Sequence, residues 1–161
     1  MNRLLILPVL LLTLLVGNPA FSADFQKGAD AARRGDFATA LREWKPLAEQ
    51  GNADAQGSLG VMYRNGHGVL QDYKTAVKWS TLAAEQGNAT AQTNLGVMYV
   101  LGLGVVQDNV YAHMWGNIAA SNGDENGGKL RDRIAKQMTA SQIDKAQDLA
   151  RECVRKEYKG C

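Results

Sequence analysis

The chain has 161 residues and carries 18 lysine and arginine residues against 16 aspartate and glutamate residues, for a formal net charge of +2. This is the length of one ordinary domain. A net charge this close to zero does not indicate the strongly basic surface on which nucleic-acid binding depends, and we expect no nucleic-acid partner.

Residues 1–22 have the pattern of a cleavable signal peptide. Arg3 precedes an apolar run of 13 residues, and Ala20 and Ser22 place small side chains at the positions that a signal peptidase reads. The run is shorter than the ~20 residues that a membrane span needs; an uncleaved anchor is the alternative. We expect an exported chain of residues 23–161, periplasmic or secreted, with no stable membrane insertion after cleavage.

Residues 24–50 predict a pair of helices joined by a short turn at Gly35 and Asp36. This first pair lacks the long glycine-containing loop of the segments that follow. Three tryptophans at or near one repeat position are expected in the core: Trp44, Trp79 and Trp115.

Two longer segments repeat one another. Residues 49–84 and 85–120 are identical at 21 of 36 positions, and a period of this length is typical of stacked repeats. We place the repeat units at 51–86 and 87–122. Each unit predicts two helices, because its apolar residues recur at helical spacing.

The helix ends are marked in both units. Gly51 and Gly87 suit the left-handed residue that follows a helix. Gly60 and Gly96 lie inside the first helix of each unit at a cost of about 1 kcal/mol relative to alanine, which indicates close approach of a neighbouring helix. Side chains that suit the cap of the next helix come at four positions: Asn52, Asp72, Asn88 and Asp108.

A glycine-containing loop joins the two helices of each unit, NGHGVLQD at residues 65–72 and LGLGVVQD at residues 101–108. A dinucleotide-binding loop needs a third glycine and a preceding strand. Gln71 and Gln107 take the place of that glycine, and no strand is predicted. The loop glycines are better explained as positive-φ residues of a turn.

Both units contain the same ordered set of residues: alanine, Leu-Gly, tyrosine, a Gly-x-Gly-Val loop, aspartate, alanine, tryptophan, alanine and a closing glycine. This pattern resembles the Sel-one-like repeat (SLR), a relative of the tetratricopeptide repeat. With the flanking helices it implies an all-α fold, an α/α solenoid of about four antiparallel helix pairs in a short right-handed superhelix. Residues 123–161 are expected to form a capping pair, with helices around 126–137 and from Ser141.

Cys153 and Cys161 are the only cysteines, and an oxidising compartment would allow them to pair. A straight helix would hold residues eight apart at ~12 Å, whereas a disulfide needs Cα atoms within ~7 Å. Pairing therefore requires the chain to turn back near residues 158–160. Secreted cysteine-rich relatives in the SLR family have paired cysteines in turns between helices. This resemblance implies a structural disulfide, and a redox-active pair is the alternative.

We expect no enzymatic activity, no catalytic residue, no cofactor and no metal site. The two histidines are His67 and His113, neither of which lies at a paired metal-ligand spacing. The sequence has no Gly-x-Ser-x-Gly or Ser-x-x-Lys motif. Some cysteine-rich members of the family that the pattern resembles have been described as β-lactamase-like. An envelope hydrolase of β-lactamase-like or peptidoglycan-related type is therefore the alternative function.

The resemblance implies an adaptor that holds a protein or peptide partner on the concave surface of the superhelix, which the first helix of each unit lines. Positions there that do not define the repeat are the candidate partner-binding residues: Asp54, Gly57, Val61, Arg64, Thr90, Thr93, Val97 and Val100. The valines with Leu101 would give an apolar groove, which suits an extended peptide or a helix face. Two alternatives stay open: the valines pack against neighbouring helices, or the outer face carries the interaction. The partner's identity and the oligomeric state are open as well.

Overall fold

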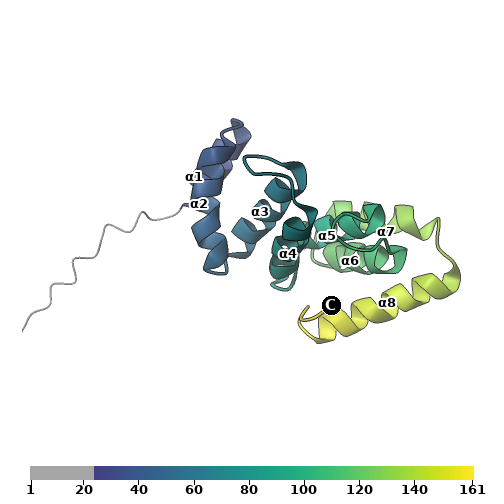
Figure 1. The fold of residues 1–161 in the computed structure, drawn as a ribbon. Helices are drawn as coiled ribbons and strands as arrows, with labels where there is room; N and C mark the ends of the chain where they lie inside the picture. Colours follow the sequence, from purple (N-terminus) through teal and green to yellow (C-terminus); the bar gives the residue numbers. More distant parts are fainter. Residues whose placement is uncertain (1–23) are drawn as a thin grey trace, which may run out of the picture.

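The computed structural model describes residues 24–161, and the predicted signal peptide over residues 1–22 lies outside them. The described chain forms eight helices that follow one another as sequential pairs (Figure 1): α1 (Phe25–Arg33), α2 (Phe37–Glu49), α3 (Ala53–Asn65), α4 (Tyr73–Ala84), α5 (Ala89–Leu101), α6 (Asn109–Ser121), α7 (Glu125–Ala135) and α8 (Ala140–Arg155). The predicted all-α fold is confirmed. None of these eight helices combines the length and the apolar character that crossing a bilayer takes.

The helices begin where the capping residues predict. The side chains of Asn52 and Asn88 accept hydrogen bonds of 2.8 and 2.9 Å from backbone amides three residues later. Asp72 and Asp108 cap α4 and α6 in the same manner. The glycine before each asparagine has a positive φ, of 96° and 84°, as the left-handed position after a helix requires.

The glycine-containing loops are turns that pack on the preceding helix pair. All four loop glycines have φ between 66° and 72°. A Cβ atom on Gly68 would lie 2.8 Å from the Cβ of Phe37, at the start of α2, and one on Gly104 would overlap the backbone of Tyr73, at the start of α4. His67 stacks on Phe37 with ring centroids 4.3 Å apart. This histidine therefore packs its loop against the first helix pair.

The glycines inside α3 and α5 are points of close helix contact, as predicted. A Cβ atom on Gly60 would overlap the Ser80 hydroxyl of α4. One on Gly96 would lie 2.7 Å from a methyl group of Leu130 on α7 and 3.2 Å from the Ala112 carbonyl oxygen of α6. An alanine at either position would force a neighbour to move, since close-packed interiors leave no space for an added methyl group.

The core of the described residues contains two hydrophobic clusters. One includes Trp44 and Leu59, between the first two helix pairs, and the other includes Leu95 and Trp115. Trp44 and Trp115 are buried, as expected of recurring aromatic residues, and Trp79 is half-buried against the first cluster.

The last helix pair is open. In the three preceding pairs the two helices pack along each other, but α8 packs on α6 and has almost no contact with α7. Helix α7 packs instead on α5 and α6. The end of α8 returns toward α4 and α5 (Figure 1). The expected capping pair is thus made of two helices that cover α6 separately, and a cleft opens beside α8.

Candidate functional site

The candidate residues lie on α3 and α5, and seven of the eight line open depressions on this side of the stack. We call this surface, formed by α1, α3, α5 and α7, the first-helix face. The exception is Thr93, which is only 9% exposed and donates a hydrogen bond of 2.9 Å to the Asp124 carboxylate. Gly127 of α7 also lies directly against it. Thr93 is therefore covered by α7, and we leave it out of the candidate surface.

One depression, of about 200 Å³, lies among α1, α3 and α5. The Asp54 carboxylate accepts a hydrogen bond of 2.8 Å from the Asn88 side chain, so part of its hydrogen-bonding capacity is satisfied within the wall. Phe25 was missed by sequence reasoning because the first helix pair departs from the repeat pattern. The lining residues are Phe25, Asp54, Gly57, Ser58, Val61, Asn88 and Thr90.

Two further depressions, of about 570 and 220 Å³, share Val97 and Leu101. Together they form one groove across the loop ends of α3, α5 and α7, which we call the loop-end groove. Its apolar lining includes Val97, Val100, Leu101 and Leu130, and Leu101 is 60% exposed. Side-chain amides line much of the remainder: Asn65, Gln71, Asn94, Asn109 and Gln137.

The charged residues that line the loop-end groove are two arginines, one in each depression, and no carboxylate lines it. The Arg64 guanidinium donates hydrogen bonds to the side-chain oxygens of Asn94, at 3.1 Å, and Asn65, at 3.3 Å. The guanidinium of Arg133, on α7, makes no hydrogen bond or ion pair with any group of residues 24–161. Sequence reasoning placed Arg64 here and missed Arg133, because α7 lacks the Leu-Gly and tyrosine that would fix its register.

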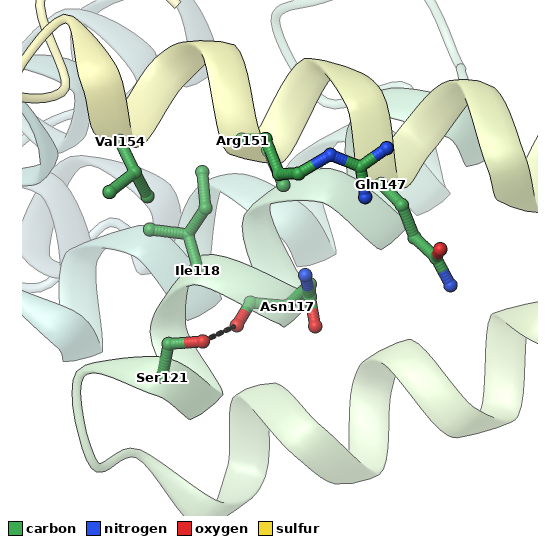
Figure 2. A pocket seen from close by; sticks show the side chains of 7 residues that line it. Asn117, Ile118, Ser121, Gln147, Arg151 and Val154 are labelled. Carbon is green, nitrogen blue, oxygen red and sulfur yellow. Dashed lines mark hydrogen bonds between the residues drawn. The ribbon is translucent and has the colours of Figure 1, made fainter.

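A separate hollow of about 370 Å³ opens between α6 and α8, where the last pair diverges. The Ser121 hydroxyl donates to the Asn117 carbonyl oxygen at 3.0 Å, and Arg151 is ion-paired with Asp148. These polar groups thus find partners within their own helices. Figure 2 shows the side chains that line the hollow, Asn117, Ile118 and Ser121 from α6 and Gln147, Arg151 and Val154 from α8.

The same repeat is found in other proteins. The family model described as "Sel1 repeat" matches residues 53–88 and 89–124. The chain is a Sel1 repeat (SLR) protein. Its structure is similar to that of c5321, described as a protective antigen present in uropathogenic Escherichia coli strains and displaying an SLR fold (TM-score 0.76, 32% identity, 81% of this chain and 30% of that one). It is also similar to a Sel1 repeat protein from Oxalobacter formigenes (TM-score 0.65, 29% identity, 69% of this chain and 46% of that one).

This SLR protein therefore spans less than half the length of either of these two relatives. No curated protein gives a significant match to the sequence. SLR repeats commonly mediate protein binding, and the matches are to repeat scaffolds, with no catalytic family among them.

His113 is a titratable side chain that is buried in the packing of the SLR fold. His113 of α6 is 3% exposed, and its Nδ1 has no hydrogen-bond partner among residues 24–161. Burial lowers the pKa of His113; the nearby charge of Arg131 lowers it further and that of Asp132 opposes this. In the same described part of the chain, no three His, Cys, Asp or Glu side chains gather as a metal site would require.

The C-terminal tail of the SLR protein is tied to the turns of the preceding pairs. Cys153 and Cys161 form a disulfide with Cα atoms 5.5 Å apart, so the predicted turn-back of the chain is confirmed. Tyr158 has a φ of 66°, and its hydroxyl donates to the Asn122 side chain at 3.1 Å. The next two residues both donate to Glu85, at 3.0 Å. The disulfide thus closes a tail that rests on the α4–α5 and α6–α7 turns.

Proposed function

We propose that this SLR protein is an exported adaptor that binds a protein or peptide partner through its first-helix face. The observation that carries the proposal is the loop-end groove, which joins a valine and leucine lining to a set of side-chain amides. Grooves of this kind suit extended peptides and helix faces. The common role of SLR repeats in protein binding supports the same conclusion.

The proposed location is the periplasm or the outside of the cell. The signal-peptide pattern of residues 1–22 supports it, as does the Cys153–Cys161 disulfide, because disulfides persist in oxidising compartments. One structural relative is described as a protective antigen, which agrees with this location. Fractionation of a C-terminally tagged chain, with mass spectrometry, should find a mature chain beginning near residue 23 outside the cytoplasm. An unprocessed cytoplasmic chain would contradict the proposal.

The adaptor function is tested by capture of a partner from an envelope extract with residues 23–161 as bait. The double variant Val97→Glu/Val100→Glu places two charges in the loop-end groove and should lose the captured protein. The matched control Leu82→Glu/Val154→Glu changes two exposed apolar side chains elsewhere, 37% and 49% exposed, and should keep it. Isothermal titration with the purified partner then gives the two dissociation constants. Equal affinity for both variants would move the site to another surface.

We also propose that the role is binding without catalysis and without nucleic acid. The repeat scaffold and the absence of a nucleophile motif in the sequence support this. Purified residues 23–161 should show no nitrocefin turnover and no peptidoglycan hydrolysis. Turnover that survives further purification would restore the hydrolase as the leading function.

A further inference from the structure

We infer that the partner segment bound in the loop-end groove is an apolar stretch of polypeptide flanked by carboxylates. This inference rests on the proposed function and goes beyond it, because it specifies which side chains the partner must present.

The apolar part of the inference comes from where large hydrophobic side chains are exposed. Five are exposed in residues 24–161, and three of these lie at the loop end of the stack: Leu70 at 90%, Leu101 at 60% and Val106 at 87%. Leu70 and Val106 occupy the same position in two successive repeats. The loops that carry them also supply Gln71 and Leu103 to the groove lining. Leu101 lies in the groove lining itself, and Leu70 and Val106 lie on loops that contribute to it. Exposed apolar side chains at a groove are typical of an interaction site.

The carboxylates follow from the charge of the lining. Arg64 and Arg133 both carry a positive charge that no carboxylate of the groove offsets. The acceptors bound to Arg64 are neutral amide oxygens. Arginine pairs with carboxylates through two parallel hydrogen bonds, and a partner of complementary charge is favoured at such a surface.

The other depression of the first-helix face provides an internal contrast. It contains Asp54 and no arginine or lysine. A partner that ran along the whole face would therefore meet opposite charges at its two ends. Among the depressions of this face, only the loop-end groove is lined by arginine, and this restricts the flanking carboxylates to the part of the partner that lies there.

The test uses three fluorescein-labelled octapeptides with one apolar centre and different flanks: EEVLLVEE, SSVLLVSS and KKVLLVKK. Binding to residues 23–161 is measured by fluorescence polarisation at 50 and 300 mM NaCl. We expect the acidic peptide to bind tightest and the basic peptide weakest, with about two- to fivefold in affinity for each arginine that is engaged. The preference should shrink at the higher salt, where exposed charges are screened.

Arg64→Gln and Arg133→Gln should each reduce the preference for the acidic over the neutral peptide, and the double variant should abolish it. Arg155→Gln, on the exposed surface of α8, is the matched control and should leave the order unchanged. Thermal melts of all variants confirm that each is folded.

The outcomes separate this inference from the proposed function. Equal binding of the three peptides, lost in Val97→Glu/Val100→Glu, would keep the groove and overturn the charge requirement. Acidic-peptide binding that survives Val97→Glu/Val100→Glu would count against the groove itself. No binding of EEVLLVEE at millimolar concentration would overturn the inference, while the partner capture decides on the groove independently. Binding of phosphatidylglycerol vesicles that needs both arginines, in place of peptide binding, would reassign the groove to a lipid surface.

Discussion

In the two central repeats the helices approach one another at glycines that recur at equivalent positions, whereas the first pair contains a buried ion pair and the C-terminal end a disulfide. Gly60 and Gly96 serve equivalent positions of α3 and α5. At the position that Trp79 and Trp115 take in α4 and α6, the first pair has Glu43, which is fully buried.

The Glu43 carboxylate is ion-paired with Lys27 of α1 at 2.7 Å. The hydrogen bond from Lys27 holds the pKa of Glu43 below its ordinary value, against burial, which raises it. At the other end the chain is closed by the Cys153–Cys161 disulfide. A central unit has a neighbour on both sides and can use one repeated packing solution. An end unit lacks one neighbour, and here each end carries a link that the central repeats do not have, the Lys27–Glu43 ion pair and the Cys153–Cys161 disulfide.

The largest expected effect is at the contact between successive central repeats. Gly104→Ala combines a φ of 72° with a Cβ atom that would overlap the Tyr73 carbonyl oxygen, so we expect a loss of about 3 kcal/mol in the free energy of unfolding. Gly123→Ala is the control, because its φ is 94° but nothing lies within 4 Å of the added atom. It should lose about 1 kcal/mol from backbone strain alone. Urea unfolding measures both, and equal losses would show that the loop does not press on α4.

The next effect is at the C-terminal end. Cys153→Ala/Cys161→Ala should lower the free energy of unfolding by about 2.5 kcal/mol, the chain-entropy estimate for so short a loop. Dithiothreitol should destabilise the native chain by a similar amount and leave the double variant unchanged. Hydrogen exchange should quicken in the tail that contacts Glu85 while α3 keeps its protection. A native chain that is insensitive to reductant would show that the tail's hydrogen bonds suffice without the disulfide.

Two glycines one turn apart in α3 sharpen the comparison within a single helix. Gly60→Ala would push against the Ser80 hydroxyl, and we expect a loss of about 1–2 kcal/mol. At Gly57 the nearest atom to an added Cβ lies 3.7 Å away. Gly57→Ala should therefore gain about 0.5–1 kcal/mol from higher helix propensity. Thermal melts should shift in opposite directions, and a parallel shift would mean that α3 can move away from α4.

The helices of the central repeats could be predicted from the sequence because the residues that recur are the ones that pack against neighbouring helices. Gly96, for example, repeats the glycine at Gly60 because two other helices contact it, so the recurrence of glycine indicates close packing. The open final pair could not be predicted in this way. Helix α7 lacks the Leu-Gly and tyrosine of the repeat. It contacts α5 through Gly127 and through Leu130, and the positions equivalent to Leu130 in the two repeats are the polar residues Asn94 and Ser58.

The candidate site shows the same limit. Arg64, Val97 and Val100 were predicted from their positions on a helix, and the structure places them in the lining of the loop-end groove. Position on a helix does not reveal what a later helix covers, which is why Thr93 was included although α7 buries it. For the same reason Arg133, which α7 contributes, could be found only in three dimensions.

The smallest expected effect concerns the one buried histidine of the central repeats. His113 takes the position of Val77 in the preceding repeat, and burial followed by the charge of Arg131 lowers its pKa below the ordinary 6.5. In the unfolded chain the imidazole binds a proton as the pH falls through 6.5, whereas the lowered pKa of the folded chain shifts this protonation to lower pH. The folded state should therefore lose stability between pH 7 and pH 5, by at most about 1.4 kcal/mol per pH unit for one proton.

Replacing His113 with the valine of the other repeat should flatten this slope in urea unfolding at pH 5, 6 and 7. His113→Gln provides the control for packing, because glutamine is polar and does not titrate in this range. It should flatten the slope as well, even if its stability at pH 7 is lower. Parallel profiles for all three chains would show that the buried imidazole is protonated in the fold. In that case the second repeat accommodates a charge at the position where the first has Val77.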